Sequence, residues 1–131
     1  GRYCTELITE KAVDFIERGS DDPFFVYASY NAPHYPMHAP KAYLDRYPDL
    51  PPDRRIMAAM ISAVDDGVGS IVRVLKDSGE YENTLIFFSS DNGPSRETRN
   101  WLDGNGVRPS LTPNMGATVF TSTLAFEKLR F

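Results

Sequence analysis

Two short apolar runs with a long amphipathic stretch between them constrain the fold of this chain more than any other feature. The runs, Phe24–Ala28 and Thr84–Ser89, are rich in aromatic and β-branched residues, which is typical of strands covered on both faces. From Asp53 to about Asp77 apolar residues recur at helical spacing, and Gly79 ends the pattern. Strand, helix and strand in this order predict a βαβ unit with parallel strands and a right-handed crossover. The expected fold class is therefore α/β, with parallel strands flanked by helices.

A further helix is expected ahead of the first strand. Thr5 and Thr9 are both possible N-caps for it, and Gly19 supplies the stop. Its apolar positions follow the helical period: Ile8, Ala12, Phe15 and Ile16.

The segment that follows the first strand carries six prolines between residues 31 and 52. Proline fixes φ and removes a hydrogen-bond donor, so we expect a structured loop with at most one helical turn near Ala42–Arg46. A loop of this composition suits a place where side chains must be held still.

His34 lies at the start of this loop, between Pro33 and Pro36. Parallel strands end at the same edge of a sheet, so the loop with His34 and the loop at Asp91 should leave on one side, where α/β sheets bind ligands. An imidazole there can transfer a proton or bind an anion. Taken alone, a loop histidine more often only hydrogen-bonds the backbone, and His38 has that interpretation too.

Asp91 and Asn92 follow the second strand directly. Carboxylate and amide oxygens suit hard divalent cations, but Ca²⁺ takes about six to eight oxygen ligands, so further ligands must come from elsewhere. The alternative is plain turn chemistry with Gly93 at positive φ. Arg96 and Arg99 could bind an anionic or sugar ligand beside this edge, although a surface salt-bridge cluster is the default interpretation.

Other candidate groups carry less weight. Asp65 and Asp66 are adjacent in a helix and diverge by roughly 100°, so a solvated or arginine-paired face is expected. Cys4 is the one cysteine, which excludes an intrachain disulfide and a Cys-rich zinc site, and it is read as a structural or free thiol.

Charge and hydropathy exclude two classes of partner. Fourteen Lys and Arg against 18 Asp and Glu give a net charge of −4 with no basic block, so no nucleic-acid partner is expected. The longest apolar run, Phe24–Ala28, is far shorter than the roughly 18 residues of a membrane span, so no transmembrane segment is expected.

Three stretches, in this order and at these separations, resemble the sulfatase family: Pro23–Pro36, Met57–Gly69 and Asn83–Gly93. The resemblance implies a partial alkaline-phosphatase-like α/β sandwich and hydrolysis of sulfated sugars or aryl sulfates. It implies that His34 contacts the sulfate near the scissile ester oxygen. It also implies that Asp91 and Asn92 are ligands of a catalytic Ca²⁺, and that the nucleophile is a formylglycine.

The resemblance covers about residues 3–104, and the chain also departs from the family. The formylglycine motif, Cys or Ser followed by x-Pro/Ala-x-Arg, is absent from the sequence, and Cys4 does not begin one. We therefore predict that 1–104 is a central part of a sulfatase-like catalytic domain and 105–131 a divergent tail, strand-like over Gly116–Leu124. Lys128 lacks the glycine-flanked setting of the family lysine.

As an isolated chain this protein is expected to be inactive. Two alternatives stay open: a phosphodiester or phosphonate hydrolase of the same superfamily, and a non-catalytic binding or assembly module that self-associates through an uncovered sheet. The family suggests an extracytoplasmic or lysosomal location, for which the chain itself carries no address.

Overall fold

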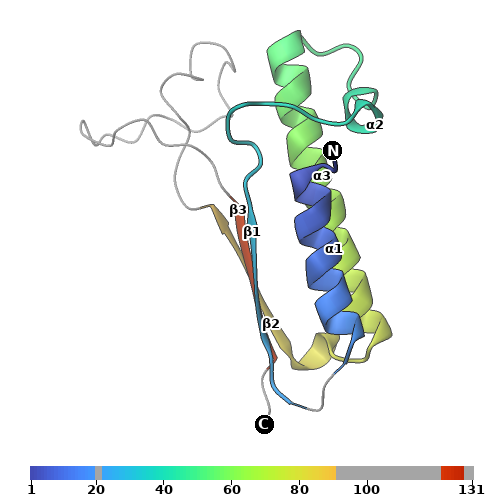
Figure 1. Cartoon of the computed structure of the whole chain (residues 1–131), viewed down its shortest axis with the longest axis vertical. Helices are drawn as coiled ribbons and strands as arrows, with labels where there is room; N and C mark the ends of the chain where they lie inside the picture. The colour runs from blue at the N-terminus through green and yellow to red at the C-terminus, as the bar shows by residue number, and fades with distance from the viewer. Residues whose placement is uncertain (20–21, 91–121, 129–131) are drawn as a thin grey trace, which may run out of the picture.

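The computed structural model describes residues 1–19 and 22–90, and the backbone of residues 122–128 (Figure 1). Helices α1 and α3 lie side by side and cover one face of a sheet. The described elements are α1 (Cys4–Glu17), β1 (Phe25–Tyr30), α2 (Lys41–Leu44), α3 (Pro52–Asp77), the 3₁₀ turn η1 (Tyr81–Asn83), β2 (Thr84–Ser90) and β3 (Ser122–Lys128). None of the helices in these ranges is long and apolar enough to cross a membrane.

The sheet has the strand order β1-β3-β2, and β3 pairs antiparallel with both neighbours. Strands β1 and β2 therefore run in the same direction, which confirms the parallel strands of the predicted βαβ unit. The two strands are not direct neighbours, because β3 lies between them. This strand comes from the tail and occupies Ser122–Lys128, which overlaps the end of the strand-like stretch Gly116–Leu124. The rest of that stretch lies outside the described residues.

The starts of the long helices lack side-chain caps, whereas their ends are followed by the predicted glycines. Neither Thr5 nor Thr9 caps a helix, because both lie within α1, which begins after Tyr3. Helix α3 begins after Pro51, and neither start has a side-chain capping bond. Proline in the first turn of α3 is tolerated because its missing N–H would have no helical partner. The predicted glycine stops are confirmed, since Gly19 and Gly79 have φ of 63° and 75°.

The core lies between the two long helices and the sheet. On β1 the residues alternate, so that Ala28 and Tyr30 are buried against the helices while Phe25 and Tyr27 point to the other side. The core is built from small and branched side chains, among them Ala12, Ile16, Val64, Ile71 and Leu75.

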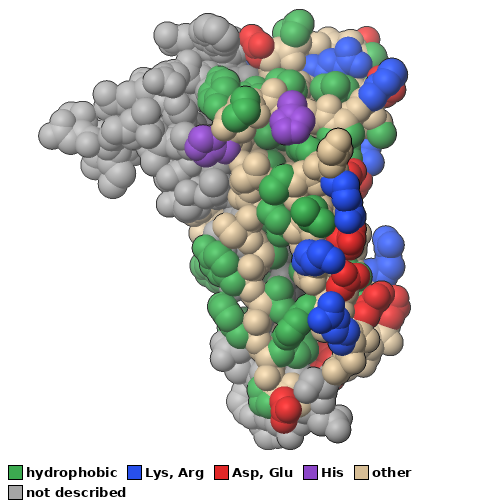
Figure 2. Space-filling model, viewed as in Figure 1, with side chains coloured by type: hydrophobic (Ala, Val, Ile, Leu, Met, Phe, Trp, Pro, Cys, Tyr) green, Lys and Arg blue, Asp and Glu red, His purple; other side chains and the backbone are tan. Residues whose placement is uncertain are grey.

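The second face of the sheet carries large apolar side chains that are more than half exposed. We call it the open face and define it by Phe25, Tyr27, Leu85 and Phe87, which are 62%, 59%, 56% and 61% exposed. Hydrophobic side chains are visible at the surface over the strands (Figure 2). The apolar composition of both strands predicted helices on both sides, but in the described residues the helices α1 and α3 cover one side alone.

Candidate active site

The last residues of β1 and β2 flank the same residue of β3. Tyr30 and Ser90 both pair with Ser122, so the two strands end at one edge of the sheet, here called the rim. The rim lies at the end of the sheet nearest α2 (Figure 1). Since neighbouring strands lie about 4.8 Å apart, the backbones of Tyr30 and Ser90 are separated by roughly 10 Å. Segments leaving β1 and β2 therefore start close enough to share a small ligand.

His34 follows Tyr30 by four positions and lies at the surface beside the rim. Its backbone N–H donates to the carbonyl of Asn31 at 2.8 Å, which closes a tight turn directly after β1. Both histidines of the chain are exposed (Figure 2). The ring Nδ1 lies 2.5 Å from the carbonyl oxygen of Tyr35. A carbonyl accepts and cannot donate, so this contact places the proton on Nδ1 and leaves Nε2 as the available nitrogen.

The hydrogen bond from the His34 ring to the Tyr35 carbonyl is the kind expected of a loop histidine that only hydrogen-bonds the backbone. It does not exclude a chemical role, because Nε2 is the nitrogen that a ligand would meet. His38 packs its ring edge-on against Tyr3, with ring centroids 5.3 Å apart, and so has a packing role.

The loop that carries His34 is tied to α3 at its far end. Arg46 and Asp66 form a two-pronged ion pair, with Nη2–Oδ2 at 2.6 Å and Nη1–Oδ1 at 3.2 Å, and the guanidinium lies 4.6 Å from the centroid of the Tyr43 ring. The hydrogen bond from Arg46 holds the pKa of the Asp66 carboxyl below its usual value. Arg55 also donates to the carbonyl of Leu44 at 2.9 Å. The predicted arginine pairing is confirmed for Asp66.

At its near end the loop begins at Tyr30, a residue that the sequence did not single out. This side chain has no exposed surface, and its hydroxyl lies 2.9 Å from the Thr9 hydroxyl on α1. Burial raises the pKa of the Tyr30 phenol. The available signal was a tyrosine two residues after the predicted strand and a glycine, Gly67, within the apolar stripe of the long helix.

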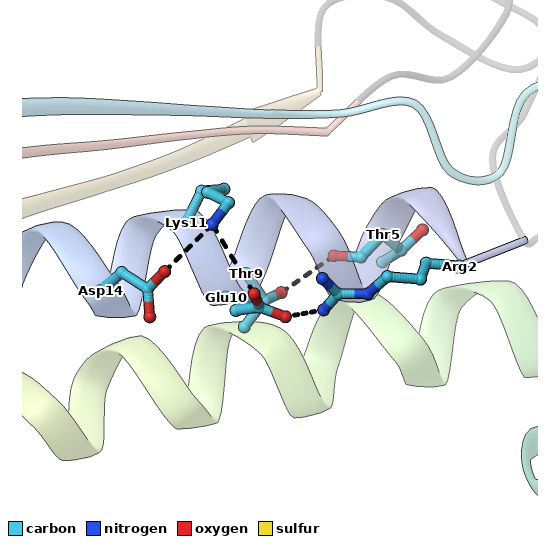
Figure 3. Close-up of polar contacts among 6 residues, drawn as sticks. All are labelled: Arg2, Thr5, Thr9, Glu10, Lys11 and Asp14. Atoms are coloured by element: carbon cyan, nitrogen blue, oxygen red, sulfur yellow. Dashed lines mark hydrogen bonds and ion pairs between the residues drawn. The ribbon is translucent and has the colours of Figure 1, made fainter.

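Thr9 lies on the inner side of α1, one turn after the buried Thr5, whereas charged side chains occupy another side of the helix. Figure 3 shows Thr9 donating to the carbonyl of Thr5, beside a chain of ion pairs along the same helix. Lys11 pairs with Asp14 at 3.2 Å and with Glu10 at 3.7 Å, and Arg2 pairs with Glu10. These charges are solvated, so each pair contributes little to stability.

The remaining candidate residues, Asp91, Asn92, Arg96 and Arg99, lie outside the described residues. Within residues 1–19 and 22–90, no group of three or more His, Cys, Asp or Glu side chains lies close enough to hold a metal ion. Cys4 is exposed and free. The described part of the site is thus the loop that carries His34, which is fixed at both ends. It lies beside the end of β2, which Asp91 follows in the sequence.

Comparison with known proteins identifies the family. The family model described as Sulfatase matches residues 1–117, which is most of the chain. The chain belongs to the sulfatase family. The uncharacterized sulfatase YdeN of Escherichia coli is 37% identical over 95 residues, 70% of this chain. Mouse arylsulfatase J is 34% identical over 105 residues, 77% of this chain, and human N-acetylgalactosamine-6-sulfatase is 35% identical over 95 residues, 68% of this chain.

A solved structure supports the same assignment. The crystal structure of Ps i-CgsB in complex with k-i-k-neocarrahexaose matches with a TM-score of 0.70 and 30% identity over 96% of this sulfatase chain. That match uses 28% of the Ps i-CgsB chain, and the three curated relatives are covered over 17%, 18% and 16% of their lengths. The chain therefore spans about a sixth of the length of these relatives. The α/β fold class and the family resemblance that the sequence predicted are confirmed.

Proposed function

We propose that these residues are part of the catalytic domain of a sulfuric ester hydrolase that acts on a sulfated sugar or an aryl sulfate. The observation that carries the proposal is a family match over residues 1–117 combined with a shared rim, at which the His34 loop leaves β1 and the Asp91 segment leaves β2. The names of the relatives, an arylsulfatase and an N-acetylgalactosamine-6-sulfatase, support the substrate class.

His34 would act on the ester oxygen or on a sulfate oxygen. With the proton of Nδ1 committed to the Tyr35 carbonyl, Nε2 is the nitrogen that faces a ligand, either as a hydrogen-bond donor in the imidazolium or as an acceptor. A sulfate ester breaks most easily when the departing alcohol oxygen receives a proton. A positioned imidazolium provides that proton, and general acid catalysis of this kind contributes about 10²–10⁴-fold.

Asp91 and Asn92 would hold part of a calcium site. Their carboxylate and amide oxygens are hard donors that fit Ca²⁺, but they supply two of the about six to eight oxygens that the ion requires. When bound, the cation would stabilise negative charge on the transferring sulfuryl oxygens. Arg96 and Arg99 would add positive charge for the sulfate. The formylglycine would come from another part of the whole protein, because the 131 residues contain no motif for it.

The test is the aryl sulfatase activity of the whole protein that contains these residues. We expect His34→Ala to lower kcat by about 10²–10⁴-fold, the range of a lost general acid, while His38→Ala stays within a few-fold of the unsubstituted protein. An aryl phosphodiester measured side by side separates the superfamily alternative. A faster rate on the phosphodiester, or a His34→Ala protein as active as His38→Ala, would overturn the proposal.

The isolated 131-residue chain should not turn over aryl sulfates and should bind Ca²⁺ weakly, since it lacks the nucleophile motif and most of the ligands. Isothermal titration calorimetry with CaCl₂ measures the second point. Tight binding that is lost on Asp91→Ala would contradict it, because the chain would then supply more ligands than those proposed.

A second candidate function, a non-catalytic assembly module, is favoured by one observation. The open face presents four large apolar side chains that are all more than half exposed. Large exposed apolar side chains on one face of a sheet suit an association site. We propose that the chain self-associates through this face.

A further inference from the structure

We propose that Tyr30 is a positioning residue for His34. Its hydroxyl is held by Thr9 of α1 and lies against Gly67 of α3, and this contact fixes the end of β1 from which the His34 loop leaves. The inference rests on the proposed role of His34 at the rim and adds residues that act through it.

The Tyr30 hydroxyl belongs to a directed chain of hydrogen bonds. Thr9 donates its single hydroxyl proton to the carbonyl of Thr5 at 3.1 Å, so at the 2.9 Å contact the Tyr30 hydroxyl must be the donor. The side chain of Tyr30 is fully buried, so water cannot replace the lost partner if this bond breaks. The position of the ring is thereby tied to α1.

Helix α3 closes the same pocket from the other side. A Cβ added at Gly67 would lie 2.4 Å from the Thr9 hydroxyl oxygen, 2.8 Å from the Tyr30 hydroxyl oxygen and 3.4 Å from the Tyr30 ring. The first two distances are shorter than real carbon–oxygen contacts, so glycine is required at this position. The tyrosine is thus clamped between two helices, and neither helix can approach or withdraw without moving it.

The link from Tyr30 to His34 is short and stiff. Tyr30 is the last residue of β1, Ala32 has no exposed surface, and the His34 N–H closes the turn on Asn31. Displacement of the strand end is therefore passed to the imidazole rather than absorbed in a flexible segment. A misplacement of about 1 Å at a reacting group can cost on the order of 10²-fold in rate.

The test uses the whole protein and substrates with different leaving groups. We expect Tyr30→Phe and Thr9→Val each to lower kcat about tenfold with KM within about twofold, the split expected from misplacement. The loss should be larger for sulfate esters of weakly acidic alcohols than for p-nitrophenyl sulfate, because weakly acidic alcohols depend more on a proton donor. Thr9→Ser, which keeps the hydroxyl, should restore the rate.

Two controls separate positioning from general destabilisation. Ile71→Val weakens the same buried core away from the rim, and Gly69→Ala alters α3 two residues from Gly67 where a Cβ meets nothing within 4 Å. Neither should change the dependence on the leaving group. A Tyr30→Phe effect no larger than that of Ile71→Val, and equal for all leaving groups, would overturn the inference.

A double variant distinguishes this inference from the proposed function itself. If Tyr30 acts through His34, adding Tyr30→Phe to His34→Ala should lower the rate no further. If His34→Ala alone has no effect, the proposed function fails. If His34→Ala lowers the rate but Tyr30→Phe has no effect, the positioning role fails. It also fails if Tyr30→Phe lowers the rate of the His34→Ala protein by the same factor as that of the unsubstituted protein.

A readout without turnover is available in the 131-residue chain. The ring signals of His34 in NMR spectra should move in Tyr30→Phe and in Thr9→Val, and should stay in place in Ile71→Val. Unmoved His34 signals in both rim variants would count against the inference.

Discussion

At the Thr9 side chain, one hydroxyl serves two partners, the Thr5 carbonyl and the Tyr30 phenol. Thr9→Val keeps the shape of the side chain but leaves the Tyr30 O–H buried without an acceptor. We expect this substitution to lower the free energy of unfolding by about 1–3 kcal/mol. Urea denaturation followed by circular dichroism measures the loss. Thr9→Ser should stay closer to the unsubstituted chain, and equal losses for both would contradict the explanation.

Buried tyrosines make the stability of the chain sensitive to alkali. Burial raises the pKa of Tyr3, Tyr30 and Tyr43 above the value of about 10 that an unfolded chain gives. The folded state therefore favours the neutral phenols. Their contribution is fully present below pH 10 and is lost as the pH rises through the higher folded-state values. Urea midpoints should fall as the pH rises above about 10. The fall should be less steep in the Tyr30→Phe variant.

At the scale of the element, α3 contains a matched pair of glycines in different surroundings. Ala at Gly67 would overpack Thr9 and Tyr30, at a cost of about 1–3 kcal/mol that exceeds the gain in helix propensity. Gly69 is exposed, and a Cβ added there would meet nothing within 4 Å, so Gly69→Ala should stabilise the helix by up to about 1 kcal/mol. Chemical denaturation of both variants tests the contrast, which the same sign of change in both would refute.

The attachment of α2 to α3 should weaken in acid. Arg46 lowers the pKa of Asp66, so the ion pair contributes stability above the unfolded value of about 3.9 and loses it as the pH falls through the lower folded value. The protection of the α2 amides against hydrogen exchange, relative to the intrinsic rate at each pH, should fall below about pH 4. In the Asp66→Asn variant the α2 amides should exchange fast already at neutral pH. In the control variant Asp65→Asn, which changes the neighbouring exposed carboxylate, they should not.

The sequence predicted the elements that depend on local pattern. The apolar stripe from Ile56 to Leu75 located α3 almost to its ends, and Gly19 and Gly79 marked the stops because a positive φ favours glycine. The helix starts were missed because α1 and α3 begin without a side-chain cap. The position of β3 was missed because pairing between distant segments leaves no periodic signal in either.

The candidate site was predictable in part. His34 was singled out because it stands between prolines at the end of an apolar run, and its chemical role stays a prediction. The shared edge followed from parallel strands. Tyr30, Thr9 and Gly67 were not found as a group, because their association depends on how closely α1, α3 and β1 approach one another. The roles of Asp91, Asn92, Arg96 and Arg99 stay predictions.

At the scale of the whole molecule, the open face should control the behaviour of the chain in solution. At a protein concentration of roughly tens of micromolar, we expect light scattering to give a mass above that of a monomer, because apolar area is removed from water on association. Leu85→Lys and Phe87→Lys should shift the protein toward monomer. Ile61→Lys, at an exposed apolar position on α3, is the matched control. A monomeric unsubstituted chain would contradict the prediction.

The middle strand of the sheet is the last of the three to be synthesised. Strand β1 emerges from the ribosome roughly a hundred residues before its partner β3, so a long loop must close before the first ladder can form. Until then β1 and β2 have no described partner in the sheet, and no described strand pairing holds the two halves of the rim in register. During translation, the geometry proposed for sulfate ester cleavage therefore depends on the arrival of Ser122–Lys128, and a nascent chain stalled before this segment would expose two apolar strands to chaperones.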